Sequence, residues 1–218
     1  MNKIKLILKT LKKKSAKLVP PFKRFVTENP VLVSGLSLGP VIAISQSLKA
    51  GVSLSVAFSI IIVPVLIIFA LIPVKLSKSI RVILCALLSC VFFIPAFWFA
   101  QTIFPEVSDK VGVFLPLMVV NPIISARSAD AAKGYKPLTS MLNGIETAIG
   151  FAVVMCLVSA VREILGKGTI WDAPIGNMQG NISFLLPFMG FIIVGLLAAG
   201  VKKLSAILDK REKGEAKK

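Results

Sequence analysis

Cysteine is the first residue type in this chain whose chemistry could support a site. Three cysteines (Cys85, Cys90 and Cys156) and no histidine occur among its 218 residues. All three lie within long apolar stretches. Cys85 and Cys90 are five positions apart, roughly 500° of helical rotation, so their thiols point in different directions. A buried cysteine usually behaves as a small apolar side chain. We therefore expect neither a metal site nor a disulfide framework from these residues.

Charged side chains at the edges of apolar stretches are a second group of candidates. Glu146 follows Asn143 near the start of one stretch, and a carboxylate inside a membrane favours an ion or proton path. The alternative, that Glu146 lies at the cytoplasmic interface, stays open on the sequence alone. Arg162 and Glu163 end the same stretch, where we expect an interfacial anchor and an ion pair.

Two helix-breaking pairs interrupt apolar runs. Gly39-Pro40 stands in SLGPVIAIS and Asn121-Pro122 in VVNPIISAR. Proline removes a helix hydrogen bond, and glycine lets another group approach closely. An unpaired backbone group in hydrocarbon costs several kcal/mol, so interrupted backbone persists only inside protein or beside a cavity. The two pairs therefore predict a central binding site of Gly39, Pro40, Asn121 and Pro122. Ordinary proline kinks are the alternative.

The elements that position these residues are predicted to be membrane-spanning helices. Hydrophobic residues make up 56% of the chain and its mean hydropathy is +0.86. A span needs roughly 20 apolar residues. We predict an all-α integral membrane protein with six spans. They correspond to charge-free stretches at Pro30–Leu48, Ala50–Val74, Val82–Pro105, Val111–Ala126, Thr147–Val161 and Ala173–Val201. The fourth and fifth are short, and the fifth extends back to Met141 if Glu146 faces the protein interior.

The six stretches divide into two similar halves, at about 29–105 and 110–201. The first span of each half is short and broken, and the two breaks lie about 83 positions apart. With three spans per half, the second half enters the membrane from the opposite side. This pattern is typical of an inverted repeat, in which broken spans meet near the midplane and mark the functional site.

The distribution of basic residues predicts the orientation. With the N-terminus in the cytoplasm, the cytoplasmic segments 1–29, 73–81, 127–140 and 202–218 hold 9, 3, 3 and 7 of the 26 lysines and arginines. The other four lie in segments predicted to be outside the cytoplasm: Lys49, Lys110, Arg162 and Lys167. Because cytoplasmic loops carry the excess of basic residues, both termini are predicted to be cytoplasmic.

The chain ends are basic. Residues 1–28 alternate lysines with leucine and isoleucine, which favours a helix on the cytoplasmic membrane surface in contact with lipids. A solvated basic tail is the alternative. Residues 202–218 form a basic tail at the end of the single membrane domain 29–218. The net charge of +16 is explained by membrane topology, so we expect no nucleic-acid partner.

Four segments together resemble a known family: NPVLVSGLSLGPVIAIS, GVFLPLMVVNPIISAR, VREILGKGTIWD and LLPFMGFIIVGLLAAG. From Asn29 onward the chain is similar to the E subunit of the Rnf ion-translocating oxidoreductase complex and the D subunit of the Nqr sodium-pumping NADH:quinone reductase. The resemblance implies a multi-pass protein of the prokaryotic cytoplasmic (inner) membrane. It also implies a homologous membrane partner of the Rnf A or Nqr E type, with B-, C-, D- and G-like subunits.

The same resemblance implies a cofactor that this sequence does not support. The family shares a 2Fe–2S cluster between the two homologous subunits, with flavin or quinone in partner subunits. Its ligands are cysteines in segments similar to Gly-Leu-Cys-Pro and Thr-Asn-Cys. Gly39 and Pro122 stand at those positions here, and neither side chain binds iron. We therefore expect no iron ligand from this chain.

Three functions follow as hypotheses. The first is a membrane subunit of an Rnf- or Nqr-type complex, taking part in transmembrane electron transfer coupled to Na⁺ or H⁺ transport, without iron ligands of its own. The second is a secondary transporter that uses the broken-helix site. The third is a purely structural subunit of the complex. In each case the chain is not a catalyst by itself.

Overall fold

The computed structural model describes residues 31–72, 77–107, 111–112, 114–132, 136–176 and 179–215, so the basic segment 1–28 lies outside the described residues. Its helices are α3 (Leu38–Ile44), α4 (Leu48–Leu71), α5 (Lys78–Ile103), α7 (Pro122–Ala131), α8 (Pro137–Lys167) and α9 (Pro187–Glu215). Short 3₁₀ turns are η1 (Pro105–Val107), η2 (Leu115–Met118) and η3 (Ile182–Leu185). Two-residue strands β1 (Thr169–Ile170) and β2 (Ala173–Pro174) form a hairpin between α8 and α9.

The prediction of an all-α membrane protein is confirmed. Among the described residues, four helices are long and apolar enough to cross a membrane, at Leu48–Leu71, Ser79–Ile103, Pro137–Lys167 and Pro187–Leu204. The predicted first and fourth spans are shorter pieces, each with a turn before a helix. The count of six spans and the orientation stay predictions. The apolar stretch predicted from Ala173 contains the hairpin strand and η3, so its helix begins only at Pro187.

Proline marks the start of three helices. Pro122, Pro137 and Pro187 are the first residues of α7, α8 and α9. At that position the missing N–H costs no hydrogen bond and the fixed φ angle suits the helix. Helix α8 ends at Lys167 and is capped by Gly168, whose φ of 68° is in the left-handed region and whose N–H bonds to the carbonyl of Ile164.

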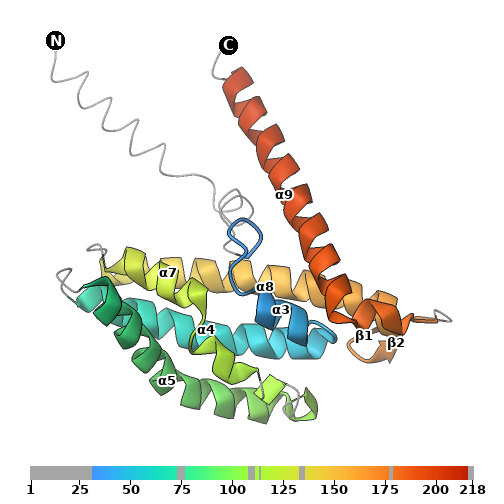
Figure 1. The fold of residues 1–218 in the computed structure, drawn as a ribbon, viewed down its shortest axis with the longest axis horizontal. Helices are drawn as coiled ribbons and strands as arrows, with labels where there is room; N and C mark the ends of the chain where they lie inside the picture. Colours follow the sequence, from blue (N-terminus) through green and yellow to red (C-terminus); the bar gives the residue numbers. More distant parts are fainter. Residues whose placement is uncertain are drawn as a thin grey trace.

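Helix α4 lies between α5 and α8, and the three helices run side by side (Figure 1). Helices α4 and α8 are antiparallel. Phe58 of α4 stacks on Phe151 of α8 with ring centroids 4.4 Å apart. Toward one end the backbone of Gly51 approaches Ser159, and toward the other Gly144 approaches Val63. Small residues allow this close approach of the two backbones. In lipid the hydrophobic effect does not favour helix association, so such close van der Waals packing stabilises the pair instead.

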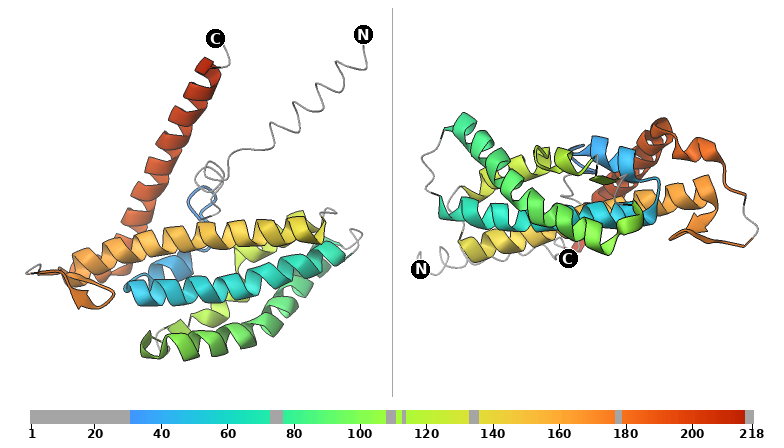
Figure 2. Two further views of the ribbon diagram at one scale, coloured as in Figure 1. Left: turned by 180° about the vertical axis from the view of Figure 1, so that it is seen from behind. Right: turned by 90° about the horizontal axis from the view of Figure 1, so that it is seen from below.

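Helix α9 contacts the bundle through its first turns and then diverges from it (Figures 1 and 2). Its neighbours are α3, α8 and η3. In the most apolar windows of α4 and α8, 50% of residues are buried within the chain, against 17% for α5 and α9. Much of the surface of α5 and α9 is therefore available to lipid or to other subunits.

The Gly51 contact predicts a steric effect. A Cβ added at Gly51 would lie 2.3 Å from Ser159 Oγ, so Gly51→Ala should force α4 and α8 apart and destabilise the fold by about 1–3 kcal/mol. Thermal unfolding in detergent micelles measures the loss. Gly195→Ala in α9 is the matched control because nothing lies within 4 Å of its Cβ position. Equal stability of the two variants would contradict this packing of α4 on α8.

Candidate functional site: the junction of the two broken segments

The two interrupted runs meet side chain to side chain. We name residues 31–44 the first broken segment and residues 114–131 the second. Ser37 Oγ of the first donates a hydrogen bond to Asn121 Oδ1 of the second over 2.5 Å. Both residues are buried, and 84 positions separate them in the sequence. Two breaks far apart in the chain therefore form one junction.

Local capping explains the geometry of the junction. Asn121 is the N-cap of α7, and its Oδ1 also accepts the backbone N–H of Ile123 at 2.8 Å. Its amide nitrogen donates to Met118 Sδ at 3.3 Å. Ser37 precedes α3 but does not cap it, because its hydroxyl is directed to Asn121. Asn121 Oδ1 therefore accepts one hydrogen bond from the start of α7 and one from the residue that precedes α3.

The first break lies slightly earlier than the sequence suggests. Gly35 and Ser37 have φ angles of 64° and 62°, in the left-handed region, and the N–H of Gly35 bonds to the carbonyl of Val31. Gly39 and Pro40 lie inside the first turn of α3. A proline there interrupts nothing, because the first N–H groups of a helix have no partner within it. Pro40 is therefore the third residue of the helix that follows the break.

The structure brings the four predicted site residues to the same junction with different exposures. Asn121 is buried and Pro40 half-buried, whereas Gly39 and Pro122 are exposed. Nothing lies within 4 Å of the Cβ position at Gly39, so a larger side chain there would enter open space. Gly39 and Pro122 thus face outward from a junction held by Ser37 and Asn121. Their role in binding a cofactor stays a prediction.

Arg162 holds the opposite end of α3. It is fully buried, and its guanidinium donates to the carbonyl of Ile42 at 2.6 Å and to Ser45 Oγ at 2.6 Å. Three more bonds reach the carbonyls of residues 184, 185 and 186 in and after η3. A cation near the carbonyl end of a helix is favoured by the helix dipole. Arg162 therefore fastens the end of α3 to η3.

Glu163, the next residue of α8, binds the start of α4. Its carboxylate accepts the backbone N–H of Leu48 at 2.5 Å. It also accepts the Thr169 hydroxyl at 3.1 Å and the N–H of Asp172 at 2.9 Å in the hairpin. A carboxylate is favoured at the N-terminal end of a helix, because the helix dipole is positive there. Adjacent residues of α8 thus hold both sides of the turn between α3 and α4.

The ion pair expected from the Arg162-Glu163 dipeptide is not among the ion pairs of the described residues. Consecutive side chains on a helix point in different directions, so each residue reaches a different element. Both are fully buried, whereas the sequence suggested an interfacial anchor.

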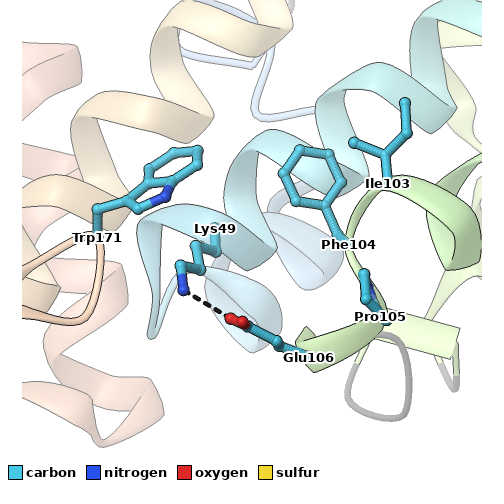
Figure 3. A pocket seen from close by; sticks show the side chains of 6 residues that line it. All are labelled: Lys49, Ile103, Phe104, Pro105, Glu106 and Trp171. Carbon is cyan, nitrogen blue, oxygen red and sulfur yellow. Dashed lines mark hydrogen bonds and ion pairs between the residues drawn. The ribbon is translucent and has the colours of Figure 1, made fainter.

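A second candidate region is a cavity of about 310 Å³ near the hairpin (Figure 3). Lys49 lines it and forms ion pairs with Glu106 at 2.6 Å and with Asp172 at 3.2 Å. Phe104 and Trp171 meet edge to face on another side, with centroids 6.5 Å apart. Lys49 and Glu106 are paired with each other in the cavity wall, and the other lining side chains are apolar or aromatic: Ile103, Phe104, Pro105 and Trp171.

Comparison with known proteins identifies the scaffold. A family described as "Rnf-Nqr subunit, membrane protein" matches residues 20–198. The chain belongs to the Rnf–Nqr family. The E subunit of the ion-translocating oxidoreductase complex of Shewanella oneidensis is 30% identical over 204 residues, covering 84% of each chain. The same subunit of Vibrio vulnificus is 30% identical over 210 residues, covering 87% of this chain and 89% of the relative.

The Nqr branch of the family is also similar. The D subunit of the Na⁺-translocating NADH-quinone reductase of Yersinia enterocolitica is 26% identical over 191 residues, covering 84% of this chain and 91% of the relative. The sequence-based recognition of an Rnf–Nqr membrane subunit is therefore confirmed.

The donors at the junction do not fit the iron–sulfur cluster that the Rnf–Nqr resemblance implies. Cluster iron requires thiolate, or occasionally imidazole, ligands. The polar side-chain groups at the junction are the Ser37 hydroxyl and the Asn121 amide, and both are engaged in hydrogen bonds, the amide to Met118 as well. The two exposed positions carry a glycine and a proline. No thiolate faces the junction from these residues.

Sequence reasoning missed the partners that hold the Rnf–Nqr scaffold together. Ser37 lies two positions before Gly39, and serine and asparagine are preferred just before helices, so two such residues at paired breaks were a usable signal. Arg162 stood out as a charge at the end of an apolar stretch, but nothing in the sequence identified its acceptors. Glu146 lies half-buried on α8, and its part in an ion path stays a prediction.

Replacing Arg162 tests its structural role. Arg162→Lys keeps the charge, but one ammonium group cannot donate to all five acceptors. Each buried carbonyl that loses its donor lowers the free energy of unfolding by about 1–3 kcal/mol. We expect a loss of at least about 2 kcal/mol in detergent unfolding. Arg81→Lys is the control, since within the described residues Arg81 makes one long bond, to the carbonyl of Ala129 at 3.5 Å. Similar stability of both variants would contradict this role.

Proposed function

We propose that this chain is a membrane subunit of an ion-translocating oxidoreductase complex of the Rnf or Nqr type, in which transmembrane electron transfer is coupled to Na⁺ or H⁺ transport. The observation that carries the proposal is the junction of the two broken segments, within a chain whose relatives bear those names. Paired broken helices are the means by which membrane proteins build a functional centre away from lipid.

The partner at this junction is a homologous membrane subunit of the Rnf A or Nqr E type. Interrupted backbone is not stable against lipid, so the outward face of the broken segments needs a protein cover. That face is exposed and apolar within the chain, with Val33 at 58%, Leu117 at 52% and Val120 at 75% exposure. The open space beside Gly39 allows a close approach by the partner.

The assembly sits in the cytoplasmic (inner) membrane, with both termini of this chain in the cytoplasm. The distribution of lysine and arginine supports this orientation. Other subunits of the B, C, D and G types complete the complex and carry its flavin or quinone groups. Under this proposal the chain takes part in the electron transfer of the complex without an iron ligand of its own.

A purely structural subunit is the second candidate function. It is favoured by the glycine and proline at the two exposed junction positions, which leave this chain without a ligand for an electron carrier. Deleting the chain's gene separates the two candidates if the remaining complex still assembles. Retained electron flux in that complex would favour the structural subunit, and lost flux with intact assembly would favour a part in electron transfer.

Co-purification tests the proposed assembly. An affinity-tagged copy of the full chain, extracted from its own organism in mild detergent, should retain a homologous Rnf A- or Nqr E-type subunit, identified by mass spectrometry. Gly39→Leu should reduce the recovered partner at least tenfold, because the leucine fills the space into which the partner packs, a loss of about 1.4 kcal/mol of binding free energy or more.

The control is Gly195→Leu, on the first half of α9. Its Cβ position is as open as that of Gly39, so neither leucine disturbs the fold of the chain itself. We expect normal partner recovery from the control. A wild-type chain that purifies without any homologous subunit, or a Gly39→Leu variant that retains it fully, would overturn the proposal.

A further inference from the structure

The junction is closed by the chain's own side chains. The Ser37 hydroxyl bridges directly to the Asn121 amide oxygen, which at the same time accepts the N–H of Ile123. The amide nitrogen is engaged with Met118. Each polar side-chain group at this point therefore has a protein partner.

The Ser37–Asn121 pair connects the two halves of the protein through a side-chain hydrogen bond between their broken segments. Ser37 is 6% and Asn121 2% exposed, so the bond is protected from competing solvent. In a low-dielectric setting such a bond is stronger than in water. Losing Asn121 leaves the buried Ser37 hydroxyl without its partner, whereas losing Ser37 leaves Asn121 Oδ1 with the N–H of Ile123 alone.

We infer that the Ser37–Asn121 hydrogen bond takes the place of a metal group as the fastener between the two broken segments of this chain. The junction is a metal-free joint. One consequence rests on the proposed function: this subunit adds no iron to the complex. The other subunits must then supply any electron carrier at this level of the membrane.

The side-chain chemistry supports the inference independently of the bond. Gly39 and Pro122 face outward from the joint, and neither can supply an electron pair to iron. A hydroxyl and a carboxamide remain, and hard, neutral oxygen donors are poor ligands for cluster iron, which is held by soft thiolates. The set of groups at the joint is therefore suited to hydrogen bonding.

Two measurements on the full-length chain in lipid nanodiscs, made without other subunits, test the inference. The first is iron and acid-labile sulfide content after anaerobic purification, with the visible absorption spectrum. We expect substoichiometric iron, no absorption band of a cluster, and a thermal unfolding midpoint that an iron chelator does not change. Stoichiometric iron and sulfide, with a midpoint that the chelator lowers, would overturn the inference.

The second measurement is a double-mutant cycle. Ser37→Ala and Asn121→Ala should each lower the unfolding midpoint, and the double variant should lose less than the sum of the two, because the shared bond is already broken in either single variant. Ser140→Ala is the matched control. Its hydroxyl is also buried but has no hydrogen-bond partner among the described residues, so its removal should cost nothing.

Strictly additive losses in the cycle, or a loss in the Ser140→Ala control equal to that of Ser37→Ala, would show that no joint exists between Ser37 and Asn121. These results concern the chain alone. They are separate from the co-purification result, so a metal-free joint can stand if the partner is not found, and the assembly can stand if iron is found.

Discussion

The structure depends on one constraint: the backbone N–H and C=O groups of an interrupted helix must find partners inside the protein, because lipid offers none. Helix α3 has seven residues, too few to be stable alone. The second half of the chain holds it at both ends, through Asn121 beside its start and Arg162 at its carbonyl end. Glu163 then satisfies the start of α4. The short helix is thus a product of tertiary contacts.

These contacts connect the two halves of the chain. Helices α4 and α8 pack through small residues and a pair of aromatic rings, and with α5 they form the frame of the bundle. The consecutive charges of α8 connect this frame to α3, the turn that follows it, and the hairpin. Displacing α8 would therefore move the outward face around Gly39, which links the packing of the frame to the surface offered to a partner.

Much of this could be predicted from the sequence because it depends on composition and local stereochemistry. Long apolar stretches indicate the spanning helices, and the paired Gly-Pro and Asn-Pro breaks indicate one common site. The sequence predicts the first break at Gly39-Pro40, whereas the backbone departs from the helix at Gly35 and Ser37. A proline in the first turn of a helix disrupts no hydrogen bond within it. The separate partners of Arg162 and Glu163 were not predictable, because they depend on how η3 and the hairpin pack.

The proposed function rests on the expectation that the two broken segments converge at the middle of the membrane. Nitroxide labels on Gly39→Cys and Pro122→Cys, in a chain whose Cys85, Cys90 and Cys156 are replaced by alanine, test it directly in nanodiscs. Electron paramagnetic resonance should show both labels relaxed strongly by oxygen and weakly by a water-soluble nickel reagent, with strong dipolar broadening between them. Labels at different depths, or without dipolar interaction, would contradict this convergence.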